Sequence, residues 1–220
     1  MNNYTSLFQS VARGLAEKGI DAESTDATPC DEDVVLKFEQ ATGMTMPESL
    51  KEFYTQFSDG FAFQWELNEG VWGCFAIPPI SELISQTESW QRNVRQFAND
   101  PTSMNRCIRP EFRPRAFEIW HEMINWIPIW HEADGDHFCV CQNGSVVYDQ
   151  HDWFDGFGRI ATTNGLLAGT SLFDHVQNWG QFYFMPPKDS WWGALAKGSS
   201  ISWQADFFPP EPGSLATPES

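Results

Sequence analysis

Basic side chains are scarce in this sequence. Its 220 residues hold 13 lysines and arginines against 30 aspartates and glutamates, which gives a formal net charge of −17 at pH 7. A protein that binds nucleic acid normally carries the opposite sign or a dense basic stripe, so we expect no nucleic-acid partner. Two explanations of the negative charge stay open. It keeps an acidic protein soluble, or it attracts a basic protein partner and speeds association.

Long hydrophobic runs are also missing. No stretch approaches the ~20 apolar residues of a membrane span, and the first residues lack the basic region and apolar core of a signal peptide. The cysteines are odd in number and scattered: Cys30, Cys74, Cys107, Cys139 and Cys141. This usage fits a reducing compartment better than a disulfide framework. We therefore expect a cytoplasmic protein without a membrane partner.

Familiar enzyme motifs are absent as well. The sequence contains no G-x-S-x-G, no H-E-x-x-H, no Walker loop and no dinucleotide-binding fingerprint. His151-Asp152 and the carboxylates around residue 134 could form an acid–base site, but only their proximity in the sequence supports one. We predict that the protein is not an enzyme, with no catalytic residues, no cofactor and no metal.

Aromatic residues are abundant, and their spacing predicts secondary structure in the first half. Eleven tryptophans and 18 phenylalanines provide a sizeable core and argue against a mainly disordered chain. Apolar residues recur at helical spacing and then alternate, as a helical region followed by a β-hairpin requires. The predicted elements are helices over 4–18, from Thr28-Pro29 to Gly43 and from Met46 to Phe57, an irregular segment over 21–28, and strands over 61–67 and 71–75.

The second half predicts a helix, a β-meander and a closing helix. The helix runs from Ile80 to about residue 98, three strand-like segments lie within 124–149, and the closing helix starts near Ser171. Residues 99–119, with three prolines and four arginines, carry a basic patch that either caps a loop against the acidic surface, the interpretation we favour, or binds an anion. The fold class is therefore α+β, an antiparallel sheet of hairpin and meander with helices packed against it.

The stretch HEADGDHFCVC, residues 131–141, has the composition of a metal site. In a strand, His137, Cys139 and Cys141 share one face. At ~3.3 Å per residue, the first and last of them lie about 13 Å apart, whereas zinc holds all its ligands within about 2.0–2.3 Å. We interpret the two cysteines as core residues. The acids before them form a glycine-containing turn and lack the twelve-residue spacing of a calcium loop.

The order of several short patterns resembles a known family. The patterns begin with Val35, Glu39, Gly43, Met46-Pro47, Leu50, Phe53-Tyr54 and Asp59-Gly60, and continue through Gly73, Ile77-Pro78, the meander INWIPIW…DGDHFCVC…GSVVYDQHD and the closing helix over 172–182. Over residues 30–183 this order resembles the SUKH superfamily, which joins fungal Smi/Knr-type regulators of cell-wall synthesis to bacterial immunity proteins. Met46 stands in place of the usual leucine, and Asp59 in place of the usual asparagine.

The resemblance implies a division of the chain into three parts. Residues 1–29 form an N-terminal helical extension, and residues 30–185 a SUKH-like domain with an insert near 99–119. Residues 186–220 form a tryptophan-rich C-terminal extension, and its last residues have the composition of a disordered tail.

The resemblance also implies a protein-binding function. Bacterial members look like immunity proteins that neutralise toxins by direct binding, and a toxin that acts on nucleic acid tends to be basic. Two alternatives stay open: a regulatory scaffold of the Smi/Knr type with an endogenous partner and, less favoured, a metal-dependent enzyme. The candidate partner-binding residues lie at hairpin and meander ends, although core packing competes for each tryptophan. They are Trp65, Glu66, Glu69, Glu132, Asp134, Asp136, Asp152 and Trp153.

Overall fold

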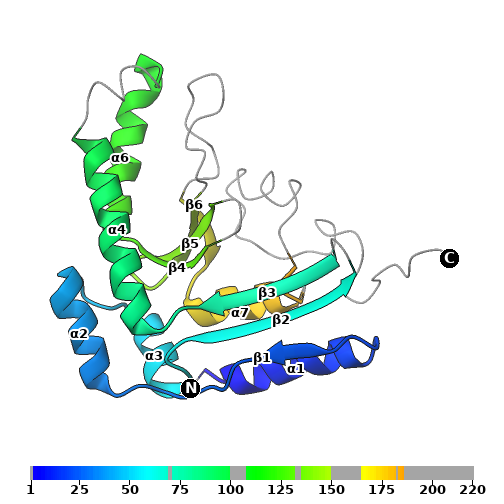
Figure 1. Ribbon diagram of the computed structural model, residues 1–220. Coiled ribbons are helices and arrows are strands. Elements are labelled where there is room, and N and C mark those ends of the chain that lie inside the picture. The colour runs from blue at the N-terminus through cyan, green and yellow to red at the C-terminus, as the bar shows by residue number, and fades with distance from the viewer. Residues whose placement is uncertain are drawn as a thin grey trace.

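A computed structural model describes residues 2–68, 71–99, 108–131, 135–149, 165–181 and 183–185, and it confirms the α+β fold (Figure 1). None of the helices in these ranges combines the length and apolar character needed to cross a membrane. The elements are α1 (Tyr4–Ala16), β1 (Ala22–Ser24), α2 (Glu32–Thr42), α3 (Glu48–Gln56), β2 (Phe61–Asn68), β3 (Val71–Ile77), α4 (Ile80–Ala98), the 3₁₀ helix η1 (Pro110–Phe112), α6 (Arg113–Met123), β4 (Ile127–His131), β5 (His137–Val140), β6 (Val146–Asp149), β7 (Leu166–Gly169) and α7 (Leu172–Gly180).

The strands form two antiparallel sheets. Sheet A has the order β1-β2-β3 and contains the predicted hairpin, while sheet B has the order β4-β5-β6-β7 and contains the predicted meander. The interpretation of residues 21–28 as irregular is wrong for β1, which pairs with β2. β7 also goes beyond the predicted strands. Both strands are short, and their own sequences carry no strand pattern. They form because neighbouring strands supply hydrogen-bond partners.

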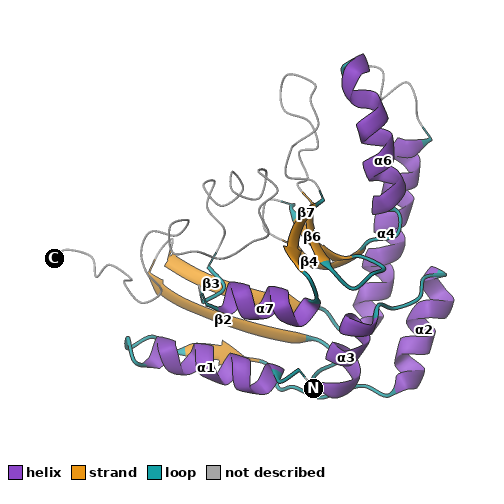
Figure 2. Ribbon diagram, turned by 180° about the vertical axis from the view of Figure 1, so that it is seen from behind, coloured by secondary structure: helices purple, strands orange, loops and turns teal. Residues whose placement is uncertain are grey.

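The N-terminal helix belongs to the main hydrophobic core. Phe8 of α1 packs its ring against Phe57, Phe61, Phe63 and Phe75, at centroid distances of 4.5–5.7 Å. Figure 2 shows α1 and α7 in front of sheet A, and in Figure 1, from the opposite side, they lie behind its strands. One face of the sheet is therefore covered by helices.

The residues that carry the family resemblance have structural roles. Gly43 ends α2 with a left-handed φ of 69°, and the Glu39 carboxylate accepts a hydrogen bond from the Met46 N–H at 2.9 Å. Asp59 accepts a hydrogen bond from the first N–H of α4, on Ile80, at 2.8 Å. Gly60 has a φ of 87°, and a Cβ there would lie 2.8 Å from the Pro79 nitrogen. These contacts connect α2, α3, β2 and α4.

Sheet B faces two hydrophobic cores, which confirms the interpretation of Cys139. Phe138 and Val140 enter the main core. Cys139, on the other face of β5, is fully buried in a second core with Trp90 and Trp120. Among the described residues, no three His, Cys, Asp or Glu side chains are grouped so that they could hold a metal ion.

The arginine- and proline-rich segment is helical where it is described from residue 110 onward. The loop interpretation is therefore wrong for η1 and α6. Pro110 and Pro114 lie in the first turns of these helices, where a missing N–H costs no hydrogen bond. Ala116, Ile119 and Met123 are buried in the second core at helical spacing. The prolines start helices here instead of preventing them.

Candidate protein-binding face

Sheet A has a second face, opposite α1 and α7. Along β2 and β3 the aromatic residues Phe61, Phe63, Trp65 and Phe75 point into the core, so the residues between them point away from it. We call this second side the outer face. Its residues are Glu23 of β1, Ala62, Gln64 and Glu66 of β2, and Trp72, Cys74 and Ala76 of β3.

Strand register brings the outer-face residues together in rows. Glu66 lies directly opposite Trp72, and Ala62 lies opposite Ala76. Side chains that face each other across antiparallel strands are in contact range. Trp72 remains 39% exposed. A large exposed aromatic side chain beside a carboxylate is a feature of protein-binding surfaces, where tryptophan is enriched at energetic hot spots.

An open depression of about 800 Å³ follows β3 along the outer face, and we call it the trough. Its floor is apolar and made of small side chains, Ala62, Cys74 and Ala76. Trp72 lines it near the start of β3, and Pro78-Pro79 lines it past the end of that strand. The other lining residues are Thr25, Asp26, Asp59, Gly60, Phe61, Ile77, Glu82, Gln86, Ile129 and Trp130.

The trough is negatively charged. Its lining includes Asp26, Asp59 and Glu82, and no lysine or arginine among the described residues. The pKa of the nearby Tyr54 hydroxyl is raised well above its ordinary value, first by burial and then by the negative charge of Asp59 and Glu82. The field of these acids thus acts inside the protein as well as on any partner outside it.

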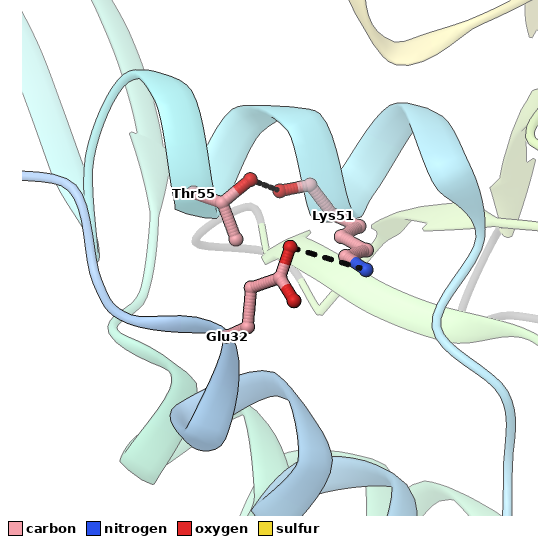
Figure 3. A network of polar contacts seen from close by, with 3 residues as sticks. All are labelled: Glu32, Lys51 and Thr55. Carbon is pink, nitrogen blue, oxygen red and sulfur yellow. Dashed lines mark hydrogen bonds and ion pairs between the residues drawn. The ribbon is translucent and has the colours of Figure 1, made fainter.

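The imbalance of charge extends to the whole region around sheet A. Residues 19–87 contain thirteen acids and two lysines, a net charge of −11. The lysines are Lys37 of α2 and Lys51 of α3. Lys51 lies 3.8 Å from a carboxylate oxygen of Glu32, and the Thr55 hydroxyl donates to the Lys51 carbonyl at 2.8 Å (Figure 3). Nothing described on the outer face offsets its acids.

Cys74 contributes surface to the trough and no reactive thiolate. Burial raises the pKa of its thiol above the ordinary value. Cysteine nucleophiles need the opposite shift, which a neighbouring cation or helix N-terminus provides. The Cys74 thiol therefore stays protonated at neutral pH and acts as part of the apolar floor.

The structure corrects two of the predicted binding residues and places a third on the outer face. Trp65 is only 4% exposed, and its indole N–H donates to the Tyr183 carbonyl at 2.6 Å. Asp136 is 6% exposed and buried too. Both side chains are therefore too little exposed to contact a partner in this conformation. Glu66 is exposed, beside Trp72. Glu69, Glu132, Asp134, Asp152 and Trp153 lie outside the described residues.

Sequence reasoning missed the most exposed tryptophan described on sheet A. Successive side chains of a strand point to opposite faces. Because Gly73 and Phe75 of β3 point inward, this alternation alone assigns Trp72 to the face opposite the core. Asp26, Asp59 and Glu82 come from three separate segments, and no local pattern indicates that they meet.

The comparisons with known proteins agree with the fold. Residues 29–165, more than half of the 220-residue chain, match the sequence pattern described as the SMI1 / KNR4 family (SUKH-1). A comparison with curated proteins found no significant match. The match contains α2, α3, the hairpin of sheet A, α4, α6 and the first three strands of sheet B, and it includes every lining residue of the trough except Thr25 and Asp26. The chain therefore belongs to the SMI1/KNR4 family (SUKH-1).

Proposed function

We propose that this chain is an immunity protein that neutralises a basic protein toxin, such as a nuclease, by direct binding through the outer face of sheet A. Membership of the SMI1/KNR4 family supports a protein partner in general. The observation that carries the proposal is the trough, which combines an exposed tryptophan, an apolar floor and acidic walls without a described cation.

Physical chemistry assigns each part of this surface a role in binding. Negative charge accelerates encounter with a basic partner and suppresses binding to acidic proteins. Trp72 and the small apolar floor supply the area that loses water in the complex, where most binding free energy resides. A toxin that acts on nucleic acid carries basic groups for its polyanionic substrate. An acidic inhibitor bound over those groups blocks the substrate without any catalytic step of its own.

The test is capture followed by protection. The tagged full chain is used as bait in lysate of its own source at about 50 mM and about 500 mM salt, since screening weakens charge attraction. We expect a basic protein that mass spectrometry identifies, that is retained mainly at low salt, and whose toxicity in growing cells is suppressed by co-expression of this chain.

Matched variants assign the binding to the outer face. Trp72→Ala is expected to raise the dissociation constant about 30-fold, as for a hot-spot residue, and Glu82→Gln is expected to slow association. Phe117→Ala and Glu88→Gln are the controls, since Phe117 is 38% exposed on α6 and Glu88 is an exposed acid of α4. Both controls should bind as the wild type does.

Two results would overturn the proposal. One is capture of only a non-toxic endogenous protein, insensitive to salt, which would make the chain a regulatory scaffold. The other is a protected toxin complex in which Trp72→Ala and Glu82→Gln behave like their controls, which would move the binding surface away from sheet A.

A further inference from the structure

The trough is elongated, and its length determines which conformation of a partner segment can contact both of its ends. Trp72 and Ala76 are four positions apart on β3, a distance of about 13 Å at the rise of a strand. Beyond Ala76 the trough continues to Pro78-Pro79. Its floor consists of alanine and cysteine side chains, which offer van der Waals contact and no charge.

The two ends of the trough differ in how they attract a cation. At the hairpin end, Glu66 lies directly opposite Trp72, so a basic side chain there stacks on the indole and meets a carboxylate. At the proline end, Asp26 and Glu82 are exposed acids. The Asp59 carboxylate is already bonded to the N–H of Ile80, which leaves the other two acids as the main attraction.

From these positions, and resting on the proposed function, we infer that the trough binds one extended segment of the toxin with the pattern basic–x–apolar–x–basic. In an extended segment, alternate side chains point to the same side, and residues four apart are separated by about 13 Å. The two basic residues then meet Glu66 with Trp72 and Asp26 with Glu82, and the apolar residue meets the floor. A helical segment with the same four-residue spacing rises only about 6 Å between the two basic residues, so this pattern reaches both ends only in an extended segment.

Peptide probes test the spacing directly. The peptide acetyl-RTVTR-amide has the inferred pattern, and acetyl-TRRTV-amide has the same composition with adjacent arginines. Each is titrated into the full-length ¹⁵N-labelled chain, with the Trp72 indole signal assigned from its loss in Trp72→Ala. We expect RTVTR to shift that signal and to bind about fivefold more tightly than TRRTV, the factor for losing one exposed cation contact.

Variants then assign each end. Glu66→Gln and Glu82→Gln should each reduce binding of RTVTR to about the affinity of TRRTV, whereas Glu88→Gln, on another part of α4, should leave it unchanged. Equal binding of both peptides, or no binding of RTVTR, would overturn the inferred pattern. Toxin capture that still depends on Trp72 would then leave the proposed function standing, while capture that is independent of Trp72 would overturn that function as well.

Discussion

The two hydrophobic cores share sheet B and differ in what surrounds them. The main core lies between sheet A, α1, α2, α3, α7 and one face of sheet B. The second core lies between α4, α6 and the opposite face of sheet B. Figure 1 shows α4 and α6 extending away from sheet A as an arm. The arm therefore has its own, smaller core.

The charges differ even more sharply between the two regions. In the sequence, residues 19–87 have a net charge of −11, whereas residues 88–123 contain five acids and six arginines, a net charge of +1. Arg92, Arg95 and Arg109 are exposed. Negative charge that served only solubility would not require acidic and basic residues to be concentrated in different regions of the chain. The comparison thus favours attraction of a partner as the reason for the negative charge.

The largest effect is expected in sheet A. A Cβ on Gly73 would lie 2.2 Å from the Tyr183 carbonyl oxygen and 2.4 Å from the Trp65 indole nitrogen. Gly73→Ala should therefore break the hydrogen bond between them and lower the free energy of unfolding by about 4 kcal/mol. Gly19→Ala is the control. It has a positive φ of 74° and no atom within 4 Å, so about 1 kcal/mol is expected. Denaturant unfolding measures both.

Truncation in each core tests whether the arm opens separately. Leu50 in the main core and Met123 in the second are both fully buried, and either change to alanine should cost about 3 kcal/mol. Hydrogen exchange should distinguish them. Leu50→Ala is expected to speed exchange throughout, and Met123→Ala mainly in α6 and the distal half of α4. Uniform acceleration in both variants would show that the two cores unfold as one unit.

Acid should weaken the main core through His175. Burial lowers the pKa of this imidazole to about 4, whereas in the unfolded chain it titrates near 6.5. Between these values the unfolded state binds more protons, so the free energy of unfolding falls with falling pH, by about 2 kcal/mol from pH 8 to pH 5. His175→Gln should remove about 2 kcal/mol of this pH dependence, which denaturant unfolding at pH 8 and pH 5 measures.

The smallest effect compares two buried tyrosines of the main core. The Tyr54 hydroxyl donates to the Pro78 carbonyl at 2.8 Å, while the Tyr4 hydroxyl is buried without a hydrogen-bond partner among the described residues. Tyr54→Phe should destabilise the protein by about 1 kcal/mol. Tyr4→Phe should be neutral or slightly stabilising, since it removes an unsatisfied polar group. Equal losses in thermal or denaturant unfolding would show that the Tyr4 hydroxyl has a partner.

Prediction from sequence succeeded where the signal was local. The inner face of α3, with Leu50, Phe53 and Tyr54, followed from helical spacing, and the end of α2 followed from Gly43. The N-cap of α7 is Ser171, whose hydroxyl accepts a hydrogen bond from the Asp174 N–H at 3.1 Å. Each of these depends on residues within a few positions of one another, so periodicity and capping chemistry were sufficient.

The candidate site was less predictable. Of the eight predicted binding residues, Glu66 lies on the outer face, Trp65 and Asp136 are buried, and the rest lie outside the described ranges. Trp65 and Trp72 are the same type of residue in the same hairpin. Trp65 is buried because it lies on the face of sheet A that α1 and α7 cover, and Trp72 is exposed because it lies on the outer face. Which face is covered depends on segments far from the hairpin in the sequence, such as Tyr183, whose carbonyl accepts the Trp65 indole hydrogen bond across 118 positions.

The sequence by itself determined the order of most elements, the hairpin, the alternation that buries Cys139 and the family, because these follow from local periodicity and short-range spacing. Only the tertiary structure decided that α1 completes the main core, that β1 joins sheet A and that three separated acids line one trough beside Trp72. The physical reason is that burial and electrostatic fields depend on which residues pack nearby in space, and those residues come from separate segments of the chain.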